Sequence, residues 1–448
     1  PLVTETPPFD PAPSKDDRGR WGGDLSGITW VEPELVIRAE LGGWTRDGHV
    51  RQTSFKGIER GRDPRTVVRE VPVASDRAVA TAEAEEPAGP GGAAAPREEA
   101  PMSTTRKAGT KRAPAATKQG TTSSGPPDSA EPDELERLAT MPAEGVWRVG
   151  GPKGDELKLT NLDKVLFPPH PTDPGAQPVT KRELVTYFAR IAPTMLPHLA
   201  ERPLNLQRFP NGASGPSFWQ KDIPSTAPAW LRRWREVGVE AREANEHLIA
   251  DRVAALCWLG NQAAFEIHAW TSRLDAPDRP TFALIDIDPG TKTTWDETLV
   301  LARLYRTALG HLGVRGYPKT TGKRGIQIWV PIEPRYSFSE TSAWVEKISK
   351  AIGSLVPELV SWDWAKASRG GKARLDYTQN ASIKTLVAPY AVRPAAGAPV
   401  SAPITWEELD DPALRPDAWT IRTIVERVAK VGDLFAAAQT DAQVLPEV

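Results

Sequence analysis

The stretch TFALIDIDPG, Thr281 to Gly290, closes an apolar run with two aspartates, Asp286 and Asp288. Alternate side chains of an extended strand share a face, so the two carboxylates point the same way, about 7 Å apart along the backbone. Two like charges at the end of a buried strand are costly unless a cation lies between them. The stretch therefore predicts a buried strand that ends at a metal site.

A third carboxylate, Asp376, lies in a second strand-like run, KARLDYTQN. Two adjacent carboxylates and a remote one are a usual way to hold two hard divalent cations about 3.5 to 4 Å apart, with a phosphate oxygen between them. This combination predicts phosphoryl or nucleotidyl transfer. Taken alone, Asp-x-Asp is weak evidence, because the Pro-Gly that follows it is also a turn signal and many such pairs cap turns.

A Gly-rich turn enters another alternating strand in YPKTTGKRGIQIWVPI, residues 317–332. Thr321 offers a hydroxyl, Lys323 and Arg324 offer cations, and the glycines free backbone N–H groups, all of which suit a triphosphate. The spacing does not match a Walker A loop. An ordinary basic hairpin turn is an equally good interpretation of this segment alone.

Two further segments carry polar and aromatic residues next to apolar ones. His268, in FEIHAWTSR, is one of 6 histidines and comes just before the aspartate strand. A lone histidine is more often a hydrogen-bonded core residue than a ligand. Phe218 and Trp219 stand beside Lys221, a combination that suits base stacking and phosphate contact, although a chain with 16 Trp must bury many of them.

Composition sets broad limits on the class of protein. The 448 residues carry 56 Lys+Arg and 58 Asp+Glu, so any polyanionic partner would have to meet a local basic surface. A single cysteine, Cys257, excludes a disulfide framework and a cysteine metal site, and it predicts a reducing cytoplasm. No run reaches the length of a membrane span, no signal peptide is evident, and a chain that begins with Pro1 is expected to be truncated.

The chain divides into three parts of different character. Residues 1–71 alternate with period two around the turn TRDGH, which predicts a small β unit. Residues 72–141 are rich in Ala, Pro, Ser and charge and predict a disordered linker, either a plain tether or a weak nucleic-acid tail. Residues 150–430 mix helical and strand patterns and predict an α/β (α+β) domain, and 431–448 a tail.

Helical periodicity marks three segments of that domain, namely 181–199, 250–265 and 341–356, and the strand-like segments are 281–288, 325–332 and 373–379.

An ordered series of motifs resembles the polymerase domain of bacterial ligase D. In order along the chain, these motifs are LTNLDKVLFP, RPLNLQRFPNG, FWQKDIPSTAPAW, FEIHAWTSR, LIDIDPG, TTGKRGIQIWVPI and RLDYTQNASIKTLVAPYAVRP. That family belongs to the archaeo-eukaryotic primase superfamily and serves non-homologous end joining. The resemblance covers about residues 155–430 and implies a primase-polymerase core of mixed and antiparallel sheets flanked by helices.

The resemblance implies a role for each matching position. Asp286, Asp288 and Asp376 would be catalytic and would bind Mn²⁺ or Mg²⁺ in a two-metal site. The residues that would hold the incoming nucleoside triphosphate are His268, Thr321, Arg324, Gln327, Arg369, Gln379 and Arg393. The residues that would contact DNA are Asn161, Lys164 and Lys181 at a 5′-phosphate, Phe218 and Trp219 stacked on the template base, and Arg208 and Lys221 on the backbone.

Two departures from the family pattern bear on activity. The strand after the Gly turn usually carries His where this chain has Gln327, and the turn is usually Ser-Gly-x-Lys-Gly where this chain has TGKRG. Glutamine donates a hydrogen bond to a phosphate but holds no proton or positive charge. Arg324 partly compensates, because its guanidinium can engage phosphate bidentately.

The N-terminal unit resembles the end of the OB-fold domain of an ATP-dependent DNA ligase. The Lys-x-Asp-Gly motif of such ligases does not occur in the 448 residues, so we expect no self-contained ligase activity. A β unit that merely caps the linker is the alternative interpretation.

Together these residues predict a DNA-repair primase-polymerase that adds nucleotides, with a family preference for ribonucleotides, to 3′ ends at double-strand breaks. The implied partners are double-stranded ends and gapped DNA with a 5′-phosphate, with Ku and a DNA ligase as protein partners, in the cytoplasm and bacterial nucleoid. A monomer is the default. The first alternative is a catalytically weak module that binds and bridges 5′-phosphorylated ends, and the second is another metal-dependent nucleotidyltransferase or a nuclease.

Overall fold

The structure is a computed structural model that describes residues 3–4, 30–34, 36–44, 50–59, 128–172, 175–236, 244–363, 366–382, 384 and 386–448. The chain divides into two compact units, Pro1–Thr117 and Lys118–Val448. Each unit is considered by itself. None of the helices in the described part is long and apolar enough to cross a membrane.

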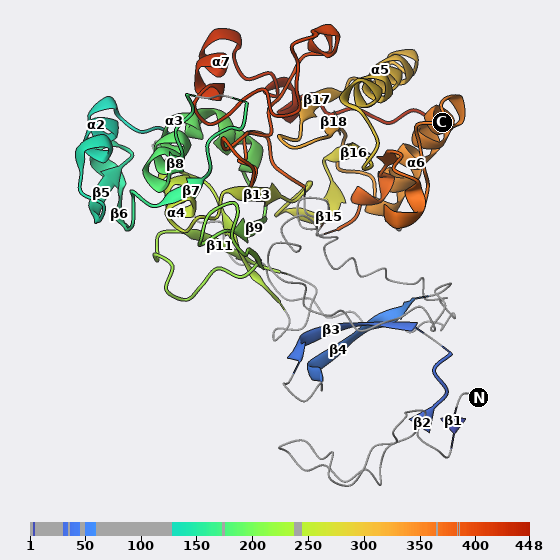
Figure 1. Ribbon diagram of the computed structural model, residues 1–448, viewed down its shortest axis with the longest axis horizontal. Helices are drawn as coiled ribbons and strands as arrows, with labels where there is room; N and C mark the ends of the chain where they lie inside the picture. The colour runs from blue at the N-terminus through green and yellow to red at the C-terminus, as the bar shows by residue number, and fades with distance from the viewer. Residues whose placement is uncertain are drawn as a thin grey trace, which may run out of the picture. The chain divides into compact units, whose positions relative to one another are not determined.

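The first unit shows two antiparallel strand pairs (Figure 1). Their strands are β1 Val3–Thr4 with β2 Trp30–Val31, and β3 Val36–Trp44 with β4 Val50–Glu59. The period-two pattern therefore predicted strands correctly here. The turn at 45–49, residues 60–71 and most of the predicted linker lie outside the described residues, and the OB-fold resemblance stays a prediction.

The second unit begins with helix α2, Pro132–Thr140, which is capped by Glu131 and Glu134. The predicted disordered linker 72–141 is therefore wrong at its C-terminal end. Glu134 also accepts hydrogen bonds from the backbone of Gly150 and Gly151, which ties the helix to the hairpin that follows. The elements up to the next helix are β5 Gly145–Val149, β6 Asp155–Leu159, β7 Val165–Phe167, β8 Val179–Thr180 and α3 Lys181–Leu199.

A five-stranded antiparallel sheet forms the centre of the first half of this unit. Its strands run in the order β10-β9-β12-β11, and β13 pairs with the other side of β9. The bounds are β9 Leu204–Arg208, β10 Phe218–Gln220, β11 Arg232–Arg235, β12 Glu246–Ile249 and β13 Glu266–Ala269, with helix α4 at Val253–Asn261. Helices α3 and α4 pack into the apolar core of this half, and α4 is buried along its whole length.

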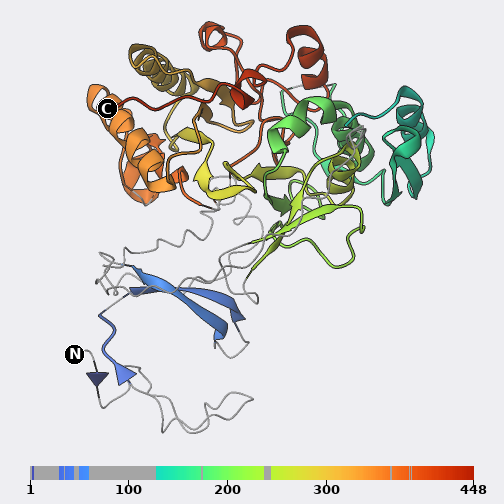
Figure 2. The same ribbon diagram turned by 180° about the vertical axis from the view of Figure 1, so that it is seen from behind.

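A four-stranded antiparallel sheet, β17-β18-β16-β19, forms the second half. Its elements, with the short hairpin that precedes them, are β14 Ser272–Arg273, β15 Ala276–Pro280, β16 Phe282–Asp288, α5 Trp295–His311, β17 Tyr317–Thr320, β18 Ile326–Pro331, α6 Phe338–Leu355 and β19 Arg374–Leu375. One face, with Ile285 and Ile287, packs with the helices α5 and α6 into a second core. Figure 2 shows these two helices together at one end of the unit.

The opposite face of this sheet is divided between apolar and polar residues. Phe282, Leu284 and Trp329 form a small cluster with Leu386 and Phe435. Further along the same face lie Asp286 and Asp288, because side chains alternate along a strand. The aspartates therefore lie at the polar end of β16, and the other side chains of this strand pack into the apolar clusters on its two faces.

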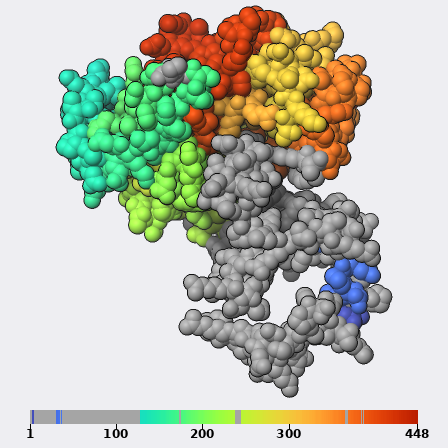
Figure 3. Space-filling model, viewed as in Figure 1, coloured from blue at the N-terminus to red at the C-terminus, as the bar shows by residue number. Residues whose placement is uncertain are grey.

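The C-terminal residues of this unit lie alongside both of its halves (Figure 3). Helix α7 is Ile424–Val431, and Phe435 beyond it is fully buried. Asp433 accepts hydrogen bonds from His198 of α3 (2.8 Å) and from Tyr390 (2.6 Å). Residues 431–448 are thus part of the folded unit, and their interpretation as a tail is wrong. The predicted helices at 181–199, 250–265 and 341–356 are confirmed as α3, α4 and α6.

Candidate active site

The three aspartates meet on one face of two paired strands. Strand β19 lies antiparallel to β16 with Ile287 opposite Leu375, and the Asp376 N–H donates to the Asp286 carbonyl (2.8 Å). This register sets Asp376 opposite Asp286, with Asp288 two residues along on the same face. The sequence predicted the shared face of Asp286 and Asp288; the pairing that adds Asp376 is a long-range contact.

Protein donors hold all three carboxylates. Gln327 Nε2 donates to Asp286 Oδ1 (3.0 Å), and Arg369 pairs with Asp288 (2.9 Å). Asp376 accepts from Gln379 Nε2 (2.9 Å). Arg374 also lies against Asp376, with Nε 3.4 Å from Oδ1. Three residues expected at the triphosphate, namely Gln327, Arg369 and Gln379, contact the aspartates in this structure.

The donor set suits hard divalent cations, because all three groups are carboxylates on one face. In the described residues, however, no group of three or more His, Cys, Asp or Glu side chains is already arranged around a possible metal position. The reason is visible in the contacts above: the carboxylates are turned toward amide and guanidinium donors. An ion that binds here has to replace some of these donors.

The Gly-rich turn lies next to the aspartate strand. Thr321 Oγ1 accepts from the Gly325 N–H (3.1 Å), which closes the turn, and Arg324 donates to the carbonyl of Gly290 (2.7 Å) just after β16. A Cβ at Gly325 would lie 2.5 Å from the Ile287 carbonyl oxygen. Glycine is therefore required for the turn to approach β16 this closely.

Arg393 reaches the same turn from the C-terminal part of the chain. Gly322 has φ +75°, and a Cβ there would lie 2.8 Å from Arg393 Cγ. Arg393 is buried and pairs with Glu266 (3.5 Å), which also bonds His268 (3.2 Å). Thr321, Arg393 and His268 are thus brought into one neighbourhood, as expected for residues that share a ligand.

Glu266 is the residue that sequence analysis missed in this cluster. Burial alone would raise its pKa, but Arg393, His268 and Lys323 outweigh that effect and hold the pKa at about 2. Among the residues that the structure describes, its Oε2 atom has no hydrogen-bond partner, and neither amide atom of the fully buried Asn205, opposite His268 on β9, has one. Unsatisfied buried polar atoms are rare, and here they gather where a polar ligand is expected. The signal in the sequence was a carboxylate in an otherwise apolar strand.

Gly322→Ala is expected to lower the free energy of unfolding by about 1 to 3 kcal/mol, because the new Cβ meets Arg393 and the Val400 backbone at a positive φ. It should also weaken nucleotide binding, since Arg393 has to move. Urea unfolding followed by tryptophan fluorescence and a nucleotide titration measure both effects. Gly310→Ala in helix α5 is the matched control, because its Cβ would contact nothing within 4 Å; equal stability of the two variants would contradict the prediction.

A separate basic cluster forms where β7, β8 and α3 meet. The Lys181 N–H donates to the Lys164 carbonyl (2.9 Å), and the antiparallel pairing of β7 with β8 brings the two lysines together. Lys164 Nζ donates to the Pro210 carbonyl (2.6 Å) and Lys181 Nζ to the Thr160 carbonyl (3.0 Å). Burial, followed by the charges of Lys164 and Arg208, lowers the pKa of Lys181. Asn161 adjoins the cluster with φ +54°.

The two aromatic residues of β10 point to opposite faces of their strand. Phe218 is about half exposed and lies over Arg208 (5.4 Å), on the opposite face of β10 from Trp219. Trp219 lies edge-on against His268 (5.0 Å). The pair therefore does not form one stacking surface: Phe218 accompanies Arg208, and Trp219 accompanies the Glu266 cluster. Lys221 directly follows β10 and is partly exposed.

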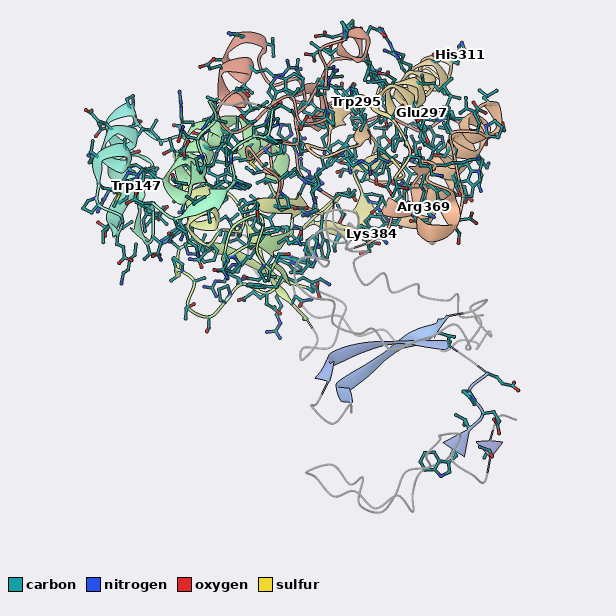
Figure 4. The ribbon with its side chains drawn as sticks, in the orientation of Figure 1. Trp147, Trp295, Glu297, His311, Arg369 and Lys384 are labelled. Atoms are coloured by element: carbon teal, nitrogen blue, oxygen red, sulfur yellow. The ribbon has the colours of Figure 1, made fainter. Side chains whose placement is uncertain are left out.

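In Figure 4, Arg369 and Lys384 lie on the side of this unit away from Trp147 of β5. Lys384, between the β19 strand and Arg393, is partly exposed. The labelled view thus places cationic residues at the end of the unit that carries β16.

The chain is similar to known proteins. The family description "LigD, primase-polymerase domain" matches residues 180–435. A Mycobacterium tuberculosis "Multifunctional non-homologous end joining DNA repair protein LigD" is 32% identical over 304 residues, 66% of this chain and 39% of that protein. The corresponding LigD of Pseudomonas aeruginosa is 27% identical over 96% of this chain and 42% of its own length. This chain thus spans about two fifths of these relatives.

A solved structure has the same fold. It is described as "Polymerase Domain from Mycobacterium tuberculosis Ligase D in complex with DNA", is 32% identical, and covers 64% of this chain and 99% of its own, with a TM-score of 0.57. The α/β fold with small antiparallel sheets is therefore that of a LigD polymerase domain. Because the family match covers more than half of its length, this chain belongs to the family of LigD primase-polymerase domains.

Proposed function

We propose that this chain is a DNA-directed nucleotidyltransferase that adds nucleotides, preferentially ribonucleotides, to 3′ ends at double-strand breaks in non-homologous end joining. The observation that carries the proposal is the juxtaposition of three carboxylates on β16 and β19 with the Gly-rich turn that meets Arg393. The relatives with this domain are described as non-homologous end joining proteins.

Each group of residues has a part in this reaction. Asp286, Asp288 and Asp376 would hold Mn²⁺ or Mg²⁺, which when bound activates the primer 3′-hydroxyl and stabilises the leaving pyrophosphate. Arg393, Arg324 and the Thr321 turn would hold the triphosphate by charge-assisted hydrogen bonds. His268 and Trp219 would flank the nucleotide.

The basic cluster supplies the contact to the downstream side of a gap. Burial lowers the pKa of Lys181, and the nearby charges of Lys164 and Arg208 lower it further; a 5′-phosphate would relieve that repulsion. We propose a 5′-phosphorylated gap or end as the DNA substrate, and Ku and a separate DNA ligase as partners in the bacterial nucleoid. We expect no nick sealing by this chain alone, and monomeric protein in solution.

The test is extension of a labelled primer on a gapped duplex, with a 5′-phosphate or a 5′-hydroxyl downstream, with ribonucleotides or deoxynucleotides, and in Mn²⁺ or Mg²⁺. The proposal expects incorporation that is favoured by the 5′-phosphate and by ribonucleotides. Tight binding of the 5′-phosphorylated duplex with no incorporation under any of these conditions would instead establish an end-binding module. The protein donors on all three aspartates are the observation that favours this second candidate.

Lys181→Met is expected to reduce the preference for 5′-phosphorylated over 5′-hydroxyl duplex by about tenfold, the value of a charge-assisted contact. In the unaltered protein, the preference for the 5′-phosphate should fall as pH rises above neutral, because Lys181 loses the positive charge that binds phosphate. The fall should begin below 10.5, the pKa of an ordinary lysine, because the pKa of Lys181 is lowered. Fluorescence anisotropy with both duplexes measures this. Lys347→Met on α6 is the control, and an unchanged preference in Lys181→Met would rule out this contact.

A further inference from the structure

Two arginines lie against the aspartates, and they are anchored differently. Arg369 belongs to a short 3-10 turn, Lys366–Arg369, outside the sheet. Arg374 belongs to strand β19, directly opposite Asp288, so its backbone is held by the ladder with β16. Its side chain is only 6% exposed. The strand pairing therefore fixes the backbone of Arg374 beside the carboxylates, and burial restricts its side chain.

The contacts of Arg374 explain why it is directed at Asp376. Its Nε lies 3.4 Å from Asp376 Oδ1, and its NH1 donates to the Asp363 carbonyl (3.3 Å). Arg369 also donates to that carbonyl (3.1 Å). Two guanidinium groups that share one acceptor repel each other, so their position depends on the three carboxylates that surround them.

Asp376 has little acceptor capacity left. Its Oδ1 accepts from Thr378 N (3.1 Å) and Thr378 Oγ1 (2.5 Å) and faces Arg374, while its Oδ2 accepts from Gln379. A carboxylate offers about four lone-pair positions. A divalent ion therefore competes at Asp376 with donors that the fold holds in place.

Charge leads to the same conclusion. The three aspartates would present a charge of about −3 to an ion, but with Arg369 and Arg374 among them the charge is about −1. The affinity of carboxylate sites for hard cations depends on the ligand charge count. A permanent positive charge a few ångströms from an ion opposes its binding in a partly buried site.

We propose that Arg374 is a positioning residue that fixes Asp376 and lowers the affinity of the aspartate cluster for divalent cations. It keeps the cluster stable without an ion and makes metal occupancy depend on added negative charge, such as that of a nucleoside triphosphate. This inference rests on the proposed function only in taking the aspartates as metal ligands.

The experiment is a Mn²⁺ titration of the full chain without nucleotide or DNA, with free Mn²⁺ followed by electron paramagnetic resonance. Arg374→Met should bind Mn²⁺ at least about tenfold more tightly than the unaltered protein, because it removes the positive charge and frees Asp376. Arg374→Lys, which keeps the charge, should stay within about threefold of the unaltered protein. Arg303→Met, which removes a surface guanidinium paired with Asp410, is the matched control and should change nothing.

Equal or weaker Mn²⁺ binding by Arg374→Met, with its fold verified by circular dichroism, would overturn the inference while leaving the polymerase proposal intact. If Arg374→Met does not fold, the comparison moves to Arg374→Gln, for which tighter binding supports the inference and unchanged binding overturns it. Absence of Mn²⁺ binding in every variant would reject the aspartates as a metal site, and with them both the inference and the two-metal part of the proposed function.

Discussion

Asp286→Asn is expected to reduce nucleotide incorporation by more than ~100-fold while leaving the protein folded. The substitution keeps the shape and an acceptor for Gln327, but it removes the charge at the centre of the aspartate row. Changing a residue that merely supports a metal ligand already costs about 10- to 100-fold in affinity or activity, so loss of a ligand should cost more. Binding of gapped DNA should change by less than about twofold, because the basic cluster is untouched.

The measurement is single-nucleotide extension on the 5′-phosphorylated gap, beside a DNA titration of the same preparation. Asp410→Asn is the matched control, since Asp410 is an exposed partner of Arg303. Retention of more than a tenth of the activity in Asp286→Asn would remove Asp286 from the mechanism. Equal loss of extension and of DNA binding would indicate a misfolded variant instead.

Local patterns in the sequence predicted those parts of the site that depend on periodicity. The alternation in residues 281–288 gave strand β16 and the shared face of Asp286 and Asp288. The same rule, applied to β10, would have separated Phe218 from Trp219, because adjacent strand residues point to opposite faces. Helix α2 also had a local signal, because Glu131 and Glu134 form a capping pair and Pro132 is the first helical residue. The polar composition of the segment nevertheless led to the prediction of a disordered linker there.

Long-range pairing was beyond such reasoning. The pairing of β19 with β16, which adds Asp376 and Arg374, joins segments almost ninety positions apart. The carboxylate pattern and the family resemblance both offered Asp376 as a third ligand, but no local pattern specifies which strands become neighbours. Neither revealed Arg374 as a partner of Asp376, nor the contacts of Gln327, Arg369 and Gln379 with the three carboxylates.

Glu266→Gln is expected to lower the free energy of unfolding at pH 7 by roughly 3 kcal/mol. The pKa of Glu266 is about 2 in the folded protein against an ordinary 4.5, a difference that corresponds to this free energy. Because the folded pKa is the lower one, the stabilisation is complete above about pH 4.5 and is lost as pH falls toward 2. Breaking a buried pair by removing one partner has a cost of the same size.

Urea unfolding between pH 7 and pH 3.5 measures both the loss and its pH dependence. The difference between the unaltered protein and Glu266→Gln should shrink as the pH falls, because protonation removes the charge that the substitution removes. Glu333→Gln, at an exposed pair with Arg335, is the control and should change stability by less than about 1 kcal/mol. A difference that stays constant with pH would mean that Glu266 acts by packing.

The same variant tests what Arg393 and His268 are for. In the unaltered protein Glu266 contacts both residues, so an incoming triphosphate has to compete with its carboxylate. Without that carboxylate, added tripolyphosphate should raise the unfolding temperature of Glu266→Gln more than that of the unaltered protein, because the anion supplies the missing charge. If tripolyphosphate stabilises both proteins equally, Arg393 and His268 serve the fold alone, and the triphosphate has to bind at the Thr321 turn without them.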